Sequence, residues 1–579
     1  MEVTYTRENA YQAATNELEE KLVAIWEGVL GAERIGIHDN FFELGGHSLK
    51  ATIVSGRIQK EVEVEIGVRD VFQYPTIKEL ATKISKSHQK KYEKLVPLSK
   101  QESYPVSSAQ RRLYTLQMMD KENVAYNMPF ALTLTGQVER VKVEQAIQQL
   151  VVKHESLRTS FHIEGEEIVQ KIADKGTLTL AYKEAESQAE VDETLARWIQ
   201  PFDLEQTPLV RSGLIKWEDR YILMIDMHHI ISDGATMGLL AEDFMKAYEG
   251  ETLVSEEIQY KEYASWEREQ KVNGVWEEQK TYWKQEFAGE LPVLELPLDG
   301  VRSQIENNEG DRIRFEIEEG IVTGLRETMS RLGGTLFMGL MAGYSILLSK
   351  YSGQEDIVIG TPIAGRRHAE LEKVAGMFVN TLAFRSYPEG DKRIEDYLLE
   401  AKQKLVQAYE NQEYPFEELV EEVNVKRDLS RNPLFEVMLV LQNTELEMMA
   451  LSDIQVKPYD NNQNKAKFDI NLNVEEVGDH LVCEMEYRSR LFRKETIEQM
   501  RKHYIKILQE ISIKIEQRLK DIDLLDEEEK HQLLAQHTKL EYSNHELIME
   551  RFESHAASHP DKIALIYENQ TMTYRELNE

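Results

Sequence analysis

Cysteine is almost absent from this sequence: one residue, Cys483, occurs among 579. A single thiol excludes an internal disulfide and a thiolate-cluster metal site. The surrounding letters LVCEMEY alternate between apolar and polar, which predicts a strand. No nearby histidine is positioned by sequence to activate the thiol, so we expect Cys483 to be a small buried hydrophobe.

Long apolar runs and positive charge are also scarce. No stretch approaches the ~20 consecutive apolar residues of a membrane span, and the opening MEVTYTRENAYQ lacks the apolar core of a secretory signal. The 69 basic and 103 acidic residues give a net charge of -34, which repels phosphate backbones and anionic lipids. We therefore expect a cytoplasmic protein with neither nucleic acid nor a membrane as partner.

The length suggests three or four folding units, at about 150 residues each, and the first is a small all-helical bundle over residues 16–84. Apolar residues recur at three- and four-residue steps behind Asn16, a plausible N-cap, up to Gly31. A second helix is expected over 48–58. A third opens at Thr76, with a glutamate three positions on in the spacing of a capping box.

The rest of the chain divides into a linker, a long α/β region and a final short segment. Residues 85–100 are polar and rich in lysine, which predicts the linker. Strands then alternate with helices over a length that exceeds one core, so two α/β lobes are expected, over 101–275 and 276–525. Residues 545–579 predict a helix followed by a strand pair, which we expect to be the start of a further domain that stops at Glu579.

The clearest candidate site in the helical bundle is Ser48. A Gly45-Gly46 turn precedes a helix whose first turn carries this serine, which places its hydroxyl beside unpaired backbone N–H groups and the positive end of the helix dipole. That position suits a phosphate ester. For a lone GGxS pattern the alternative is that Ser48 merely caps the helix. The neighbouring His47 is interpreted as a residue of a partner-binding surface rather than a base.

The letters DNFFELGGHSL decide between these alternatives, because they resemble the pattern DNFFxLGGxSL of peptidyl carrier domains in nonribosomal peptide synthetases. The resemblance covers 16–84 and implies a four-helix bundle. It also implies transfer of 4'-phosphopantetheine onto Ser48 by a phosphopantetheinyl transferase, giving an arm whose thiol carries an aminoacyl or peptidyl thioester. An upstream adenylation domain is the implied source of that acyl group.

The stretch YILMIDMHHIISDGATM places two histidines, His228 and His229, at the end of a predicted strand, ahead of Asp233 and Gly234. Strand alternation puts the two imidazoles on opposite faces, so one can face a cavity. The HxxxD spacing suits an imidazole that handles a proton and a carboxylate that fixes its loop. A metal site needs a third ligand, and adjacent strand residues do not readily chelate one ion, so no metal is expected. For the isolated motif a structural role remains open.

Seven motifs between 101 and 525 resemble, in the expected order, the condensation domains of the same synthetases, which are relatives of chloramphenicol acetyltransferase. They are SSAQRRLYTL, HESLRTSF, MHHIISDG, YKEYASW, IGTPIAGR with GMFVNT, YPFEEL and RDLSRNPLFEVM. The chain as a whole resembles a module junction of the tyrocidine and gramicidin synthetase type, which implies antibiotic-peptide biosynthesis. There are departures: Lys153 stands where arginine is usual, Tyr114 where tryptophan is common, and Ala235-Thr236 could alter the acceptor-side channel.

The resemblance implies a two-lobed fold with a tunnel in which His229 sits midway, and a reaction in which the acceptor α-amine attacks the donor thioester. His229 can act as a base or position the amine, and the sequence leaves both open. We expect Asp233 to hold its loop through a salt bridge, with Arg366 as the first candidate partner and Arg158 as the second. Gly234 is expected to let a backbone N–H approach the developing oxyanion. His228 is expected to pack inward.

Four other functions fit parts of the pattern. An epimerisation domain shares HHxxxDG, but SSAQRRLYTL is of condensation type and MTYRELNE resembles the opening of an adenylation domain. Downstream adenylation and carrier domains are therefore implied partners, and a donor of L configuration is favoured. A heterocyclising relative would carry aspartates in place of the histidines. An acyltransferase that uses coenzyme A would not need the attached carrier, and an inactive condensation-like scaffold would not need an intact His229 and Gly234.

Overall fold

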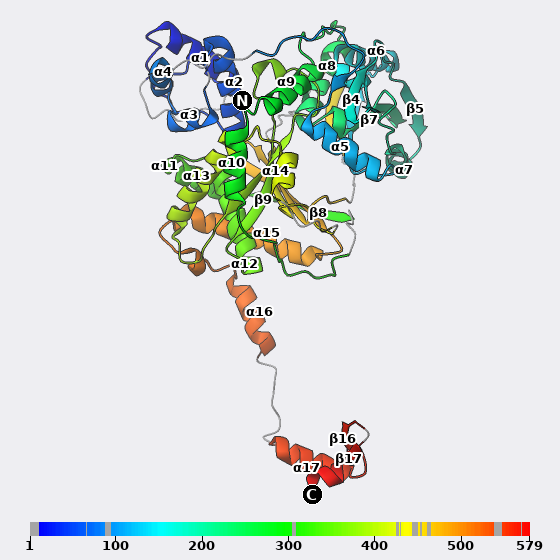
Figure 1. The fold of residues 1–579 in the computed structure, drawn as a ribbon, viewed down its shortest axis with the longest axis vertical. Coiled ribbons are helices and arrows are strands. Elements are labelled where there is room, and N and C mark those ends of the chain that lie inside the picture. Colours follow the sequence, from blue (N-terminus) through cyan, green and yellow to red (C-terminus); the bar gives the residue numbers. More distant parts are fainter. Residues whose placement is uncertain are drawn as a thin grey trace. The chain divides into compact units, whose positions relative to one another are not determined.

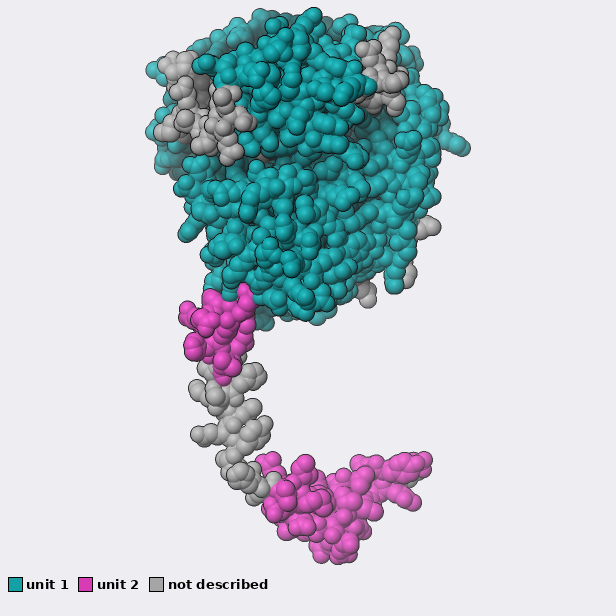
Figure 2. All heavy atoms as spheres, turned by 90° about the vertical axis from the view of Figure 1, so that its left-hand side faces the viewer, with its two compact units in different colours: residues 1–522 teal, residues 523–579 magenta. Residues whose placement is uncertain are grey.

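The structure is a computed structural model of the chain. It describes residues 11–579 except residue 65 and residues 87–93, 304–308, 424–427, 429, 443–449, 452–453, 460–464, 538–546 and 569. The described chain forms two compact units, Met1–Ile522 and Asp523–Glu579, which Figure 2 shows in different colours. Each unit is treated by itself. The candidate sites predicted from the sequence all lie in the first.

The first unit opens with the predicted helical bundle, at the blue end of the ribbon in Figure 1. Its four helices are α1 (Glu17–Leu30), α2 (Ser48–Val62), α3 (Val68–Gln73) and α4 (Ile77–Lys86). The Asn16 side chain accepts the backbone N–H of Glu19, and Gly31 ends α1 at a φ of 69°, so both predicted caps are confirmed. Helix α2 runs four residues beyond the predicted end. Fully buried Leu22, Trp26 and other apolar side chains hold the bundle together.

The stretch predicted as a linker, residues 85–100, follows the bundle. Residues 87–93 of the predicted linker lie outside the described residues, and residues 94–100 have no regular structure. Leu95 nevertheless packs into the core of the next region, and the backbone N–H of Leu98 donates to Glu262 at 3.1 Å. The end of the predicted linker is therefore fixed against the α/β region by the burial of Leu95 and the hydrogen bond of Leu98.

The first half of the α/β region is built on a sheet of order β12-β13-β2-β7-β6-β5, beside a small sheet of order β1-β4-β3. Helix α6 packs against α8, and the apolar core of this half fills the space between the sheet and its helices. The elements of this half are β1 (Tyr104–Pro105), α5 (Ser108–Met119), β2 (Asn127–Gly136), α6 (Arg140–Lys153), η1 (Glu155–Arg158), β3 (Thr159–Glu164), β4 (Glu167–Ile172), β5 (Leu180–Ala185), α7 (Gln188–Trp198), β6 (Val210–Trp217), β7 (Arg220–His228), η2 (His229–Ile231), α8 (Gly234–Tyr248) and α9 (Tyr260–Val272). Helix α10 (Glu277–Glu286) follows and packs against the second half, where the Trp283 side chain donates to the carbonyl of Asn411.

The second half has its own six-stranded sheet, of order β10-β9-β11-β14-β15-β8. Helices α11, α12 and α15 pack against one another beside it, and α12 is buried along most of its length (Figure 1). The elements are β8 (Gly310–Ile317), α11 (Glu319–Arg331), α12 (Leu336–Ser352), β9 (Ile357–Ile363), η3 (Ala369–Leu371), β10 (Asn380–Ser386), α13 (Ile394–Glu410), α14 (Phe416–Glu422), β11 (Val437–Gln442), β12 (Ala450–Leu451), β13 (Ile454–Pro458), β14 (Ile470–Val477), β15 (His480–Arg488), α15 (Lys494–Ile513) and η4 (Leu519–Asp521).

One strand crosses the predicted division at residue 275. Strand β13 lies far inside the stretch assigned to the second lobe, yet it pairs antiparallel with β2 of the first sheet, from Ile454 opposite Gly136 to Pro458 opposite Leu132. The edge of β2 needs a partner for its backbone groups, and the alternating residues of β13 bury Ile454 and Val456 there. The later part of the chain therefore supplies a strand to the first sheet, and the two halves are not separate along the sequence.

The second unit contains α16 (Glu527–His537), α17 (Ile548–Ser558), β16 (Ile563–Tyr567), β17 (Gln570–Thr573) and α18 (Tyr574–Asn578). The predicted helix and antiparallel strand pair are thus present between 547 and 579. Among the described residues no single helix has the length and apolar character to cross a membrane. Helices α11 and α12, bent by 105° at their junction, pass that test only as a pair, on length and composition.

Candidate active site

The residue that precedes Ser48, rather than Ser48 itself, caps α2. His47 is the N-cap, and its Nδ1 accepts the backbone N–H of Lys50 at 3.4 Å. The capping alternative for Ser48 is therefore wrong. His47 caps the helix, and its place on a partner-binding surface stays a prediction. Burial lowers the pKa of His47 to about 3, which keeps its ring nitrogen available as an acceptor.

The turn before α2 explains the two glycines. Gly45 has a φ of 83°, which favours glycine, and a Cβ at Gly46 would collide with the Phe41 ring. Ser48, placed here by its backbone, is the first residue of the 15-residue α2. The free N–H groups and partial positive charge of a helix N-terminus suit a phosphate ester at this position, so the local structure fits an attached 4'-phosphopantetheine.

The two histidines lie at the junction between β7 and η2. Strand β7 ends at His228, and His229 begins the 3-10 turn, so the predicted placement of both on one strand is wrong for His229. His228 packs inward as predicted: it is fully buried, its Nδ1 accepts the N–H of Ile230, and its Nε2 lies 3.2 Å from the Gln117 amide oxygen. His229 is only partly buried, so its side chain is not sealed in the core.

Hydrogen bonding fixes the form of the His229 ring. Nδ1 lies 2.7 Å from the carbonyl oxygen of Ser232. Because a carbonyl only accepts, Nδ1 carries the proton, and in the neutral imidazole the lone pair is on Nε2. None of the described residues hydrogen-bonds Nε2. Burial first, and then the positive charge of Lys467, lower the pKa of His229 to about 4, so the ring is neutral at neutral pH.

Sequence reasoning missed two residues that shape this environment. The backbone N–H of His229 donates to the carbonyl of Tyr126 at 2.8 Å, and the Lys467 ammonium lies 5.6 Å from the centre of the Tyr126 ring. Lys467 follows β13 in the second half of the chain, whereas Tyr126 precedes β2 in the first. The histidine therefore lies where the two halves approach each other. No motif identifies Lys467, since it stands 238 positions from His229.

Asp233 is a structural anchor between the two halves. It is fully buried and caps α8 through Oδ1, which accepts the N–H of Thr236 at 2.7 Å. The same oxygen is 3.0 Å from the Arg366 guanidinium, and Oδ2 accepts the N–H of Phe378 at 3.0 Å. The predicted ion pair with Arg366 is thus confirmed. The second candidate, Arg158, donates instead to the carbonyl of Ala173 and lies near Glu155.

Arg366 ties the anchor to the loop around it. Its guanidinium donates to the carbonyls of Leu371 and Val374, and it stacks on the Phe378 ring at 4.1 Å. Thr236, which was expected to influence the acceptor channel, is fully buried and donates to the carbonyl of Gly376 at 2.9 Å. Its role here is therefore to join α8 to the second half.

Gly234 begins α8 directly after the anchor. A Cβ built at this residue would meet no heavy atom within 4 Å, and its backbone lies outside the left-handed region. The fold itself therefore places no demand for glycine at this position. The open space beside it is available to a reacting group, which is consistent with the predicted approach of the backbone N–H.

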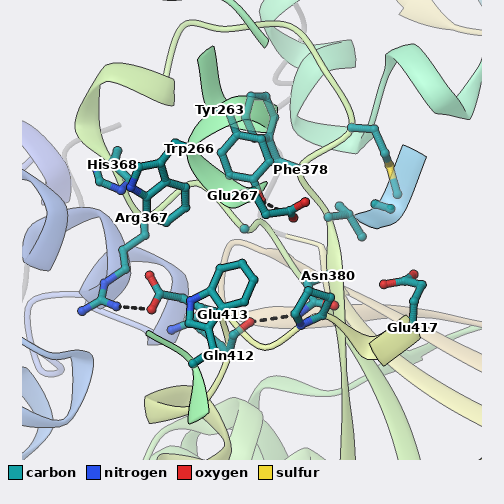
Figure 3. Close-up of a pocket in the computed structure, with 16 residues that line it drawn as sticks. Tyr263, Trp266, Glu267, Arg367, His368, Phe378, Asn380, Gln412, Glu413 and Glu417 are labelled. Atoms are coloured by element: carbon teal, nitrogen blue, oxygen red, sulfur yellow. Dashed lines mark hydrogen bonds and ion pairs between the residues drawn. The ribbon is translucent and has the colours of Figure 1, made fainter. Parts of the chain in front are cut away.

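A small pocket lies between the two halves, next to the anchor. Figure 3 shows aromatic side chains, among them Tyr263 and Trp266 of α9, on one wall, with Arg367 and Glu413 paired at 2.7 Å on another. Phe378, whose backbone holds Asp233, also lines it. The lining does not include His229 or Gly234. The pocket thus reaches the loop that supports the histidine turn, within one residue of Arg366.

Two buried acids, Glu267 in this wall and Asp243 on α8, are held by hydrogen bonds and ion pairs. Glu267 accepts the N–H of Ser108 at 2.6 Å, but burial, with a smaller contribution from Glu417, raises its pKa to about 7. On α8, Asp243 pairs with Lys153 at 2.7 Å and with His154 at 2.8 Å. The departure from arginine at position 153 therefore still supplies a cation for a buried carboxylate. Among the described residues, no group of three or more side chains could hold a metal ion.

Comparison with known families divides the chain as follows. The condensation domain family matches residues 100–534, and the phosphopantetheine attachment site matches residues 20–84. The chain is 42% identical over 573 residues to gramicidin S synthase 2 of Brevibacillus brevis, covering 98% of this chain and 13% of that protein. It is 43% identical over 575 residues to tyrocidine synthase 3 of Brevibacillus parabrevis, covering 99% and 9%. It thus spans a small part of these relatives.

Solved structures share the fold at low sequence identity. The X-domain from teicoplanin biosynthesis superimposes with a TM-score of 0.69 at 22% identity, covering 75% of this chain and 100% of that one. A four-domain nonribosomal peptide synthetase bound to AMP and glycine gives a TM-score of 0.70 at 24% identity, covering 84% and 38%. These similarities establish the architecture around the histidine turn.

Proposed function

The chain belongs to the condensation-domain family and carries a phosphopantetheine attachment domain, and from this premise we propose that it joins amino acids by forming a peptide bond. The acyl donor is held by the arm on Ser48, and the acceptor is the α-amine of a second amino acid. When bound, 4'-phosphopantetheine supplies a thiol that holds the donor as a reactive thioester. The observation that carries the proposal is the neutral His229 ring, partly exposed, whose Nε2 bonds none of the described residues.

His229 positions the amine rather than taking a full proton from it. A free α-amine has a pKa of about 7.7 to 8.0, whereas the pKa of His229 is about 4. Complete proton transfer across roughly four pKa units would cost about 5 kcal/mol. A hydrogen bond from the amine to Nε2 avoids that cost and aligns the nitrogen lone pair with the donor carbonyl. Alignment of this kind is itself a large source of rate.

The groups around His229 keep this geometry. The Ser232 carbonyl holds Nδ1–H, so the lone pair stays on Nε2, and the Tyr126 carbonyl holds the histidine backbone. Asp233 fixes the start of α8 through its bonds to Thr236 and Arg366 and does not act as a base. The Gly234 N–H, at the positive end of α8 and beside open space, stabilises the carbonyl oxygen on which charge develops.

The partners follow from this reaction. We assign as partners a phosphopantetheinyl transferase that modifies Ser48, an upstream adenylation domain that loads the arm, and downstream adenylation and carrier domains that present the acceptor. The helix and strand pair of α17 to β17 form the beginning of that adenylation domain.

The experiment that tests the proposal uses the full chain. A phosphopantetheinyl transferase loads Ser48 from an aminoacyl coenzyme A, an amino-acid thioester of a short thiol serves as acceptor, and the dipeptide is measured by mass spectrometry. We expect a dipeptide bound to the acceptor thiol, and none from the Ser48→Ala chain under the same conditions. Equal product from Ser48→Ala, or none from the loaded wild type with several acceptors, would contradict the proposed function.

A further inference from the structure

The helical bundle contacts the α/β region through a specific patch of α2. A Cβ on Gly56 would collide with the carbonyl oxygen of Arg367, so the two backbones approach as closely as glycine allows. Next to it, the Arg57 guanidinium binds Glu372 through two hydrogen bonds, of 3.1 and 2.8 Å. Both members of this pair are about two-thirds buried, with 31% and 28% of their side chains exposed.

A second contact supports the first. Helix α3 packs against α13, where Arg69 lies 3.3 Å from Glu410. Phe72 and Leu399 line the groove between these helices. In both ion pairs the arginine is on the bundle and the glutamate is on the α/β region. Together the two pairs hold the bundle in one orientation.

The patch lies beside the pocket described above. Arg367, which meets Gly56, also lines that pocket and pairs there with Glu413. Ser48 is eight residues before Gly56 on the same helix, which corresponds to about 12 Å along its axis. The start of α2 therefore lies about 12 Å along the helix from the contact with Arg367, a residue that lines the pocket.

We propose that Gly56 and Arg57 form a docking surface through which the bundle binds the Arg367–Glu372 segment, and that the donor is delivered from this docked arrangement. The inference rests on the proposed function, because it names the partner surface of the same site. Gly56 is the specificity element: any side chain there pushes α2 away from Arg367. Arg57 is a positioning residue, because it acts on the orientation of the bundle and touches no reacting atom.

Delivery is tested with one donor that needs docking and one that does not. The full chain is assayed in single turnover with the donor on Ser48, and separately with the same aminoacyl group on free pantetheine. For Arg57→Glu, we expect the rate from Ser48 to fall about tenfold, since attraction is replaced by repulsion. Glu372→Arg behaves the same way, and the exchanged pair Arg57→Glu/Glu372→Arg recovers the rate to within about twofold.

Two variants separate docking from folding. Gly56→Ala improves the helix propensity of α2, so it does not weaken the bundle through α2, yet it lowers the rate from Ser48 at least about fivefold. Lys60→Glu, an exposed residue on the same helix, makes the same charge change and leaves that rate unchanged. In Arg57→Glu, Gly56→Ala and Lys60→Glu the rate from free pantetheine stays within about twofold of wild type, because these changes leave the α/β region unaltered.

Docking is also measured without turnover. Cys483 is fully buried, so nitroxide labels react at cysteines introduced in place of Lys60 and Lys373, which are exposed on the two sides of the contact. One short distance is expected, and Arg57→Glu should add a long, broad population. Unchanged rates and distances in Arg57→Glu and Gly56→Ala would overturn the inference. If wild type makes no product from either donor, the proposed function fails, and the label distances alone decide whether the bundle docks here.

Discussion

Replacing Asp233 by asparagine removes one negative charge from a fully buried position and changes little else. The asparagine oxygen still accepts the N–H of Thr236, so the cap of α8 is retained. Arg366, of which 8% of the side chain is exposed, loses its carboxylate partner. Breaking a buried pair by removing one charge costs about 3 to 5 kcal/mol, because the remaining ion is left without compensation. We expect the free energy of unfolding to fall by that amount.

Urea unfolding followed by tryptophan fluorescence measures this loss, since Trp266 and Trp276 lie close to the anchor in the same pocket. The variant Asp219→Asn is the control: it makes the same change at an exposed site, 3.9 Å from Arg220, and should shift stability by less than about 0.5 kcal/mol. Adding Arg366→Gln to Asp233→Asn should cost much less than Arg366→Gln alone. If Asp233 were instead a catalytic base, Asp233→Asn would lower the rate and leave the free energy of unfolding unchanged. An Asp233→Asn chain as stable as wild type, with its rate lost, would refute the structural role.

Three further changes test other parts of the site. Gly234→Ala should leave the free energy of unfolding equal to wild type or slightly higher, because its Cβ meets open space and alanine favours the helix. The rate of peptide-bond formation should fall about tenfold or more, because the added methyl group occupies the space of the reacting carbonyl. An unchanged rate would show that this space stays empty during the reaction. In a rate profile from pH 5.5 to 9, His229 should give no inflection near 6.5, because its pKa of about 4 keeps the ring neutral over this range. As the pH is lowered, the rate should fall only because the acceptor amine becomes protonated near pH 8. An inflection near 6.5 that persists with a weakly basic acceptor would contradict the neutral ring. Gly46→Ala should lower the melting temperature of the helical bundle and reduce modification of Ser48 by the transferase, because the added Cβ collides with Phe41. Normal modification and an unchanged melting temperature would contradict the packing of that turn.

Local features of the fold were predictable from the sequence because their causes are local. Asn16 and Gly31 limit α1 since a side-chain acceptor and a left-handed residue act within one turn of the helix. The inward packing of His228 was predictable because the residue ends a largely apolar strand, and β7 is buried from Ile222 to its end. The ion pair of Asp233 with Arg366 was predictable only through the family resemblance, because no pattern in the sequence brings together residues that are 133 positions apart.

The rest depends on contacts that sequence patterns do not encode. Strand β13 is five residues long and alternates like many others, and only the unpaired edge of β2 decides where it pairs. The sequence left open whether His229 acts as a base or positions the amine. We propose positioning because burial, and Lys467 approaching from the other half of the chain, lower the pKa of His229 to about 4. Both effects arise only after folding.

The most direct test of the account is the single-turnover rate of peptide-bond formation from donor-loaded Ser48 in wild type and in His229→Ala. Removing Nε2 takes away the acceptor that aligns the amine, so we predict a loss of about a hundredfold or more with an unchanged free energy of unfolding to within about 1 kcal/mol. A His229→Ala chain that is folded, fully loaded and as fast as wild type would contradict the assignment of this imidazole to the reaction.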